Sequence, residues 1–239
     1  MPYKNIELTR KDHVAGITLK QTAMNLETAQ ELSDVCATIN GDEDVYVVII
    51  TGNGGVFCTG SLKGEILPAS AIADIEKPVI AAINGDALEE GLEMTLAADI
   101  RVASSKARFG LPRVAEGKIP SDGGTQRLPR IVGRGKALEM LLTGDVLDAS
   151  EALEIGLVSR VVAPDALEAE TQKLAETIAA KGPIALRYTK EAVIKGMDMT
   201  LTQGLRLEAD LYFLIHTTSD RTEGIKSYLE KCPPKFKNG

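Results

Sequence analysis

Four acidic residues lie close together in the segment GDALEEGLEMT (85–95), where the pattern predicts that a helix begins. Asp86 and Glu89 have the spacing of a capping box, and acidic residues in a first helical turn are favoured by the helix dipole. These two residues therefore need no catalytic role. Glu93 lies further along, between two apolar residues, and a carboxylate buried on that face is costly without a function. We therefore take Glu93 as a candidate for proton transfer.

Two loops that contain glycine could supply a second kind of chemistry. The apolar run VYVVIITG (45–52) leads into NGGVFCTGSLKG (53–64), and KPVIAAIN (77–84) leads into the acidic segment. Loops at strand ends are the usual sites in α/β folds, and backbone N–H groups that converge from two loops form an oxyanion hole. A helix that begins near Glu90 would add its dipole. An ordinary pair of glycine turns remains the alternative reading of the spacing.

Hydrophobic periodicity in the first half of the chain is typical of an α/β fold. Residues 5–20 alternate in the manner of a hairpin, with a turn near 11–13, and residues 26–39 have helical spacing. Runs that are almost continuously apolar are typical of strands buried on both faces of a sheet. Together with 100–104, the two runs named above alternate with helices, which predicts parallel strands joined by crossover connections.

The pattern changes to helical from about residue 136 onward. We therefore predict an α/β core over 1–165 and a helical C-terminal part over 166–239, which packs on itself or on another subunit. The stretch GKIPSDGGTQRLPRIVG (117–133) is irregular, with two prolines and paired glycines between apolar elements. A long structured connection explains this stretch as well as a functional loop does.

Composition narrows the classes of function. The formal net charge is −7 and aromatic residues make up only 4%, so base stacking or phosphate binding along nucleic acid is disfavoured. Three cysteines at unrelated spacings indicate neither a disulfide framework nor a metal site. The amino terminus has no apolar leader and no run reaches membrane-spanning length, so we expect a soluble cytoplasmic protein.

Motifs along almost the whole chain resemble the crotonase (enoyl-CoA hydratase/isomerase) superfamily. They are VVIITGNGGVFCTGS, EKPVIAAINGDAL, ARFGLPRV, GKIPSDGGTQRLPRIVG and ALEMLLTGDVLDASEALEIGLVSRVV. The resemblance implies an α/β fold with a spiral core of ββα units and a C-terminal helical trimerisation part, often as a dimer of trimers. The ligand would be an acyl-CoA thioester bound by the core, with CoA as part of the substrate. No metal and no separate cofactor is implied.

The resemblance also implies roles for particular residues. The backbone N–H groups of Ser61 and Glu90 would hold the thioester oxygen as it becomes enolate-like, and Glu93 matches the first of two catalytic glutamates. The second glutamate would lie in FGLPRV, where this chain has Arg113 instead. The residues expected to line the substrate are Gly60, Leu62, Gly91 and Pro120. The helix start departs from the family pattern, because Glu89 and Glu90 replace two glycines, and the loop after Gly60 is shorter than usual.

Arg113 leaves three interpretations open. In the first, the protein is a hydratase in which Glu93 alone moves protons, since arginine stays charged and cannot act as an acid. In the second, Arg113 holds a carboxylate on the substrate of an isomerase or decarboxylase. In the third, Arg113 is structural, and the enzyme is weak or is a non-catalytic acyl-CoA-binding subunit. We expect hydration of an acyl-CoA thioester, with these alternatives.

Overall fold

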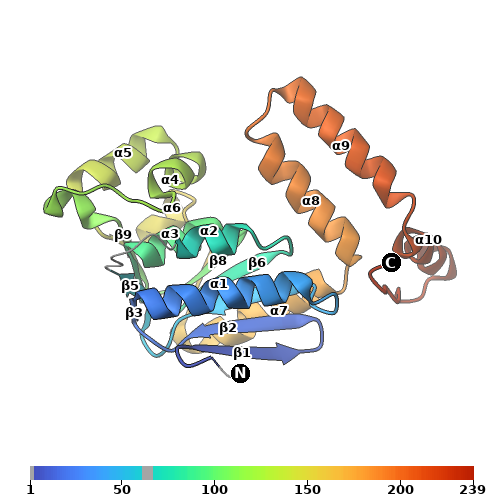
Figure 1. Cartoon of the computed structure of the whole chain (residues 1–239), viewed down its shortest axis with the longest axis horizontal. Helices are drawn as coiled ribbons and strands as arrows, with labels where there is room; N and C mark the ends of the chain where they lie inside the picture. The colour runs from blue at the N-terminus through green and yellow to red at the C-terminus, as the bar shows by residue number, and fades with distance from the viewer. Residues whose placement is uncertain (1–2, 61–66) are drawn as a thin grey trace.

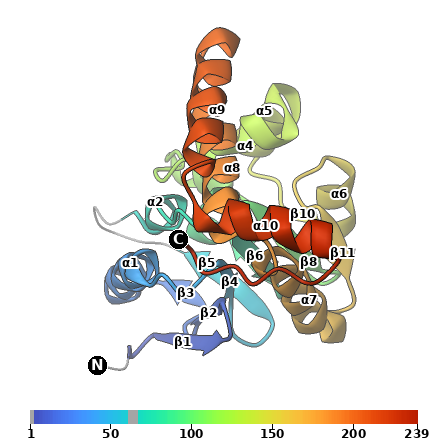
Figure 2. The same ribbon diagram turned by 90° about the vertical axis from the view of Figure 1, so that its right-hand side faces the viewer.

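The structure is a computed structural model that describes residues 3–60 and 67–239. An α/β body carries a pair of long helices that project away from it, followed by a last helix and the carboxyl terminus (Figure 1). The last helix lies on the outer side of α8, beside the carboxyl terminus, and it stands in front of the body in the side view (Figure 2). The α/β class predicted from the apolar runs is thus confirmed.

The strands form two sheets within the described residues. One has the order β1-β2-β4-β6-β8-β11, with β1 antiparallel and the other strands parallel, and the second has the order β10-β9-β7-β5-β3, with only β10 antiparallel. The strands are β1 (Ile6–Lys11), β2 (Val14–Leu19), β3 (Ala23–Met24), β4 (Val47–Thr51), β5 (Val56–Gly60), β6 (Val79–Ile83), β7 (Asp86–Leu88), β8 (Ile100–Ser104), β9 (Arg108–Gly110), β10 (Leu147–Asp148) and β11 (Arg160–Val162).

The same ββα unit recurs along the body. Strand β4 lies in the first sheet and β5 in the second, and a helix, α2, comes later in the chain; β6, β7 and α3 repeat this order. Because β5 and β7 are parallel neighbours, their carboxyl ends lie at the same edge of the second sheet. This repeat brings the described end of β5, at Gly60, beside the start of α3 at Glu90.

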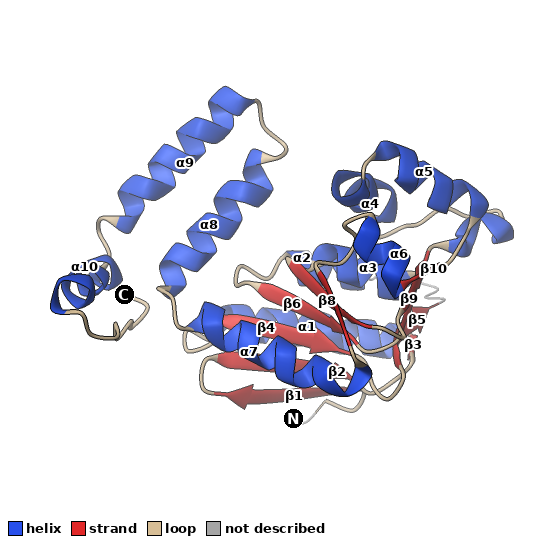
Figure 3. Ribbon diagram, turned by 180° about the vertical axis from the view of Figure 1, so that it is seen from behind, coloured by secondary structure: helices blue, strands red, loops and turns tan. Residues whose placement is uncertain are grey.

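Both faces of the first sheet are buried, as the continuous apolar runs predicted. On β4, Val48 and Ile50 contribute to the core that includes α1 and α2, whereas Val47 points into a second core against α7. Strand β6 alternates in the same way, with Val79 on one side and Ile80 on the other. Figure 3 shows α7 on the face of this sheet opposite α1 and α2.

Helices cover the sheets and form most of the second half of the chain. The helices α8 and α9 pack as an antiparallel pair, which Figures 1 and 3 show projecting from the body. The helices are α1 (Leu26–Gly41), α2 (Pro68–Ala73), α3 (Glu90–Ala97), α4 (Gly124–Val132), α5 (Arg134–Thr143), α6 (Ala149–Glu154), α7 (Leu167–Ala179), α8 (Pro183–Gly196), α9 (Leu201–Ile215) and α10 (Ser219–Glu230), with 3₁₀ helices η1 (Pro112–Glu116) and η2 (Pro164–Ala166).

The acidic segment does not form the capping box expected from its spacing. Asp86 begins strand β7 and pairs with Arg108 across the strands at 2.6 Å, so it cannot cap a helix. The helix begins only at Glu90, and Glu89 makes no side-chain cap hydrogen bond. The prediction was wrong because the chain stays extended through Leu88 in order to pair with β5 and β9.

The irregular stretch 117–133 contains a helix as well as a connection. Gly117 adopts a left-handed conformation after η1, and α4 begins at Gly124 with Pro129 inside it. Arg127 donates a hydrogen bond back to the carbonyl of Asp122 at 2.7 Å, which fixes the turn that enters the helix. None of the helices in the described part of the chain is long and apolar enough to cross a membrane.

Asp122 connects this turn to α2, fifty residues earlier in the chain. Its buried carboxylate accepts the backbone N–H of Ala69 at 2.6 Å, the N–H of Ser70 at 3.1 Å and the Ser70 hydroxyl at 2.7 Å. These are N–H groups of a first helical turn, which have no partner inside the helix. Asp122 therefore caps α2 from a distant part of the chain.

We expect Asp122→Ala to lower the free energy of unfolding by about 2 kcal/mol, because it leaves buried donors of α2 without an acceptor. For a chain of this size the thermal midpoint should fall by roughly 5 °C. Asp122→Asn keeps one acceptor oxygen and should lose less. Differential scanning calorimetry of both variants measures this, and an unchanged midpoint in Asp122→Ala would contradict the cap.

Candidate active site

The candidate site is built at the amino end of α3, where it meets the second sheet. Helix α3 packs on β5 and β7, and the approach is so close that a Cβ on Gly91 would overlap the carbonyl of Cys58. A side chain at Gly60 would likewise overlap the Glu90 carboxylate, which therefore lies over the end of β5. Two positions predicted to line the substrate are thus glycines because the packing leaves no room for side chains.

Glu93 lies one turn into α3 and is completely buried. Its Oε1 accepts the backbone N–H of Asp122 at 2.7 Å and that of Gly124 at 2.9 Å. Gly124 must lack a side chain, because a Cβ there would lie 3.1 Å from this oxygen and 2.8 Å from Pro120. The second oxygen, Oε2, is buried and has no hydrogen-bond partner among the described residues.

Burial is the largest influence on the pKa of Glu93. Removal from water raises the pKa of this carboxyl above its ordinary value, while the two N–H groups of Gly124 and Asp122 act in the opposite direction. The nearby Asp122 carboxylate raises the pKa further, and Arg113 lowers it. A carboxylate with one oxygen fixed and the other unsatisfied in a dry site is suited to take a proton from a bound group.

Arg113 is buried in η1 and contacts two other acids. Its Nη2 donates a hydrogen bond to Oε1 of Glu90, and its Nε lies 2.9 Å from Oε2 of Glu89. No hydrogen bond or ion pair joins it to Glu93 in the described residues, so it influences Glu93 only through its charge. Arg113 therefore lies at the start of α3, where it forms ion pairs with Glu89 and Glu90.

The two acids beside Arg113 have different environments. Glu90 is 3% exposed and accepts the guanidinium hydrogen bond. Glu89 lies close to the guanidinium without hydrogen-bond alignment, since neither Arg113 Nε nor Glu89 Oε2 has a hydrogen-bond partner. Burial therefore outweighs the attraction of Arg113 and raises the pKa of Glu89 to about 7.

The backbone at Glu89 is strained. Its φ of 53° and ψ of −122° lie in a region that glycine adopts readily and other residues avoid. Such residues persist where the surroundings hold them, and they cluster at functional sites. The departure from the family pattern noted in the sequence, glutamate for glycine, thus falls on a position whose conformation favours glycine.

The other predicted site residues lie around the same helix start. Glu90 is the first residue of α3, and Gly60 ends the neighbouring strand. Ser61 and Leu62 fall outside the described residues. Pro120 lies in the segment that supplies the Glu93 hydrogen bonds, next to Gly124. The described residues among the predictions therefore gather at one end of α3.

Sequence reasoning missed two contributors, Asp122 and the carboxylate of Glu89. Asp122 was visible only as one letter in an irregular loop, although an acid before paired glycines in SDGG was a usable signal for a structured turn. Glu89 was assigned to helix capping, and only the extended conformation of β7 shows otherwise.

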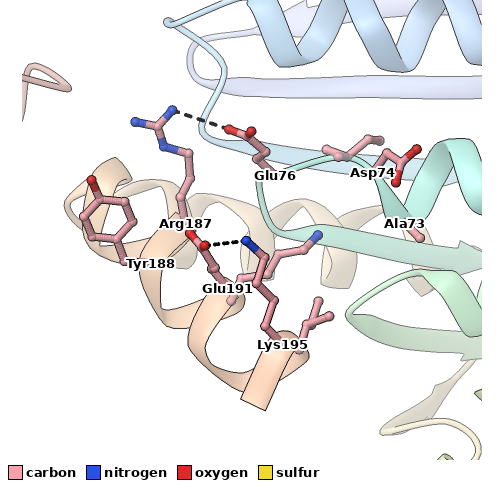
Figure 4. A pocket seen from close by; sticks show the side chains of 10 residues that line it. Ala73, Asp74, Glu76, Arg187, Tyr188, Glu191 and Lys195 are labelled. Atoms are coloured by element: carbon pink, nitrogen blue, oxygen red, sulfur yellow. Dashed lines mark hydrogen bonds and ion pairs between the residues drawn. The ribbon is translucent and has the colours of Figure 1, made fainter. Parts of the chain in front are cut away.

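A cavity of about 500 Å³ lies elsewhere, between the end of α2 and helix α8 (Figure 4). Its charged walls pair with one another: Arg187 lies 3.9 Å from Glu76, and Lys195 lies 2.6 Å from Glu191. None of the predicted site residues lines it. The candidate site therefore stays at the start of α3, where the predicted residues gather, and does not include this cavity.

Known proteins share both the sequence and the fold of this chain. A family model described as enoyl-CoA hydratase/isomerase matches residues 63–239. A crotonyl-CoA hydratase of Syntrophomonas wolfei is 38% identical, and the match covers 99% of each chain. An (E)-benzylidenesuccinyl-CoA hydratase of Thauera aromatica is also 38% identical, over 97% of this chain and 98% of that one. The first alignment spans 257 positions, more than the 239 residues here, so this chain lacks some residues of that relative.

Solved structures agree with these relatives. The crystal structure of an enoyl-CoA hydratase from Bacillus anthracis matches with a TM-score of 0.96 and 37% identity, over 99% of this chain and all of that one. The alternation of strands between two sheets is therefore the ββα core that the motifs predicted. The chain belongs to the enoyl-CoA hydratase/isomerase family, the crotonase superfamily.

Proposed function

We propose that this enzyme adds water to the double bond of an α,β-unsaturated acyl-CoA thioester, with Glu93 as the general base. The observation that carries the proposal is the Glu93 carboxylate, which is fully buried, fixed through one oxygen and without a partner at the other. Burial of such an oxygen is costly unless a ligand or water completes it. Relatives named as hydratases of CoA thioesters support the choice of reaction.

In the proposed reaction, Glu93 takes a proton from a water molecule whose oxygen bonds to the β-carbon. The electrons of the double bond move toward the thioester carbonyl, whose oxygen becomes enolate-like. The N–H groups of Ser61 and Glu90 are proposed to hold this oxygen, and a preformed donor of this kind is worth about 3 kcal/mol. CoA enters and leaves as part of the substrate and product.

The contacts of Arg113 favour hydration over decarboxylation of a substrate that carries a second carboxylate. That alternative requires a guanidinium ready to pair with the substrate. Here the guanidinium already donates a hydrogen bond to the buried carboxylate of Glu90 and lies 2.9 Å from Glu89. A substrate carboxylate would have to compete with Glu90 for this cation, which would disfavour its binding.

We further propose that the active form is a homotrimer or a dimer of trimers joined through the C-terminal helices. In the single chain these helices expose large apolar side chains and bury few: Leu211 is the one buried residue of α9. The exposed side chains on α8, α9 and α10 include Val193, Met197, Leu201, Leu205, Phe213, Tyr228 and Leu229. Many large apolar side chains exposed on neighbouring helices favour an interface between proteins.

Glu93→Gln should reduce the rate of hydration at least 100-fold, because an amide cannot accept the proton, while the fold and the thioester affinity stay close to wild type. Mass spectrometry of a panel of short, cyclic and dicarboxylic acyl-CoAs detects the gain of one water. Titration calorimetry with a saturated acyl-CoA measures affinity. Glu116→Gln, an exposed acid of η1, is the matched control. Unchanged turnover in Glu93→Gln contradicts the assignment, and tight binding without any mass change in wild type indicates a binding subunit.

Phe213→Arg should reduce the oligomer to smaller species, because it places a charge among the exposed apolar side chains near the carboxyl end of α9. Light scattering coupled to size-exclusion chromatography gives the mass of each species. Glu168→Arg on α7, an exposed site away from these helices, should leave the mass unchanged. A wild-type protein that elutes as a monomer at micromolar concentration would refute the proposed assembly.

A further inference from the structure

Glu89 combines two unfavourable features that a structural role does not require. Its backbone holds a conformation suited to glycine, with φ at 53°. Its carboxylate is nearly buried, with 14% of the side chain exposed, yet Oε2 receives no hydrogen bond. Replacement by glycine would remove both costs. Strain of this kind, observed beside a candidate site, motivates a functional hypothesis.

Arg113 interacts less strongly with Glu89 than with Glu90. The guanidinium donates its hydrogen bond to Glu90 and offers Glu89 only proximity. Four charged groups act on Glu89: Arg113 favours its charged form, whereas Glu90, Glu116 and Glu93 disfavour it. With burial added, the pKa of Glu89 rises to about 7, so a proton resides on this group for much of the time at neutral pH.

Glu89 is also close to the general base. The N–H of Glu93 donates to the carbonyl of Glu89 at 3.0 Å, so the two residues are one helical turn apart. The negative charge of Glu93 also raises the pKa of Glu89. Two carboxyl groups whose charges interact titrate as a coupled pair, and a state with a single proton is favoured at intermediate pH.

We propose that Glu89 is the second acid of the site and delivers the proton that the α-carbon receives during hydration. This inference rests on the proposed function. As water bonds to the β-carbon, its proton passes to Glu93; the enolate then collapses, and the proton on Glu89 forms the new bond at the α-carbon. Arg113 stabilises the Glu89 carboxylate that results. The proton left on Glu93 returns to Glu89 through water, so the pair is restored and no other reactant is needed.

This arrangement accounts for arginine at position 113. In this arrangement the proton donor is Glu89, next to the start of α3, and not a residue of η1. Arg113 of η1 instead lies where its positive charge stabilises the negative charge that Glu89 acquires. Glu90 fixes the guanidinium by accepting its hydrogen bond.

The test compares Glu89→Gln and Glu89→Gly with Glu116→Gln, whose carboxylate also acts on Glu89 but is exposed. Both Glu89 variants should lose at least 100-fold in kcat with little change in KM. Glu89→Gly should nevertheless unfold at the same or a higher temperature than wild type, because it relieves the backbone strain. Glu116→Gln should hydrate at close to the wild-type rate. Loss of activity with retained stability separates proton delivery from a role in folding.

The pH dependence supplies a second readout. The active site needs one proton on the Glu89–Glu93 pair, so kcat/KM of wild type should fall as pH rises past about 7. The same carboxyl group should affect stability. The pKa of Glu89 is about 7 in the folded protein and 4.5 ordinarily, so between pH 4.5 and 7 the folded protein binds more protons than the unfolded chain. The free energy of unfolding should therefore decline as pH rises through this window. Glu89→Gln should flatten that decline.

The outcomes separate this inference from the proposed function. Wild-type protein that hydrates none of the thioesters contradicts both. If wild type hydrates them and Glu93→Gln does not, but Glu89→Gln retains wild-type kcat, the role of Glu89 is overturned while the hydratase stands. A loss confined to Glu90→Gln, with Glu89→Gln active, also overturns it and assigns the second acid to Glu90.

Discussion

The hydrogen bonds from Asp122 and Gly124 to a single oxygen of Glu93 hold the candidate site together. They join α3, which carries the base, to the segment that enters α4, and Asp122 extends the connection to α2 through its own carboxylate. Three elements distant in sequence are thereby positioned by one buried polar cluster. If any one of these elements moved, buried hydrogen-bonding groups of the other two would lose their partners, which costs free energy. The close approach at Gly91 and Gly124 is the steric counterpart of this constraint.

A second cluster, formed by Arg113, Glu89 and Glu90, lies at the same helix end and balances charge differently. Two carboxylates and one cation leave an excess negative charge when all are ionised, beside the buried Glu93. A helix amino terminus favours nearby anions, which offsets part of this excess. Burial raises the pKa of Glu89 to about 7, so a proton on this carboxyl relieves part of the remaining imbalance near neutral pH. The charge balance at this helix end and the proton donor proposed for hydration therefore involve the same carboxyl group.

The sequence was informative where a single physical effect dominates. Continuous β-branched runs such as 45–52 have few alternatives to a strand buried on both faces, and the apolar neighbours of Glu93 indicated its burial correctly. Prediction failed where two effects compete. Asp86 and Glu89 fit a capping box by spacing, but pairing of β7 with its neighbours prevailed over helix initiation. The partners of Arg113 and the cap supplied by Asp122 depend on contacts between segments twenty to fifty residues apart, which no local pattern encodes. The division of the chain at residue 165 and the individual catalytic roles stay predictions.

The anchoring of α2 by Asp122 has a consequence for how such an enzyme can diversify. The amino end of α2 is fixed from the α4 side, through backbone N–H groups that any sequence would provide. Residues inserted or deleted before α2 therefore need not move Glu93, since loop length itself costs little free energy. The chain is shorter than the relative aligned over 257 positions, yet its fold matches a full-length structure. The length of the chain before α2 and the position of Glu93 can accordingly change independently in evolution, with Asp122 as the boundary between them.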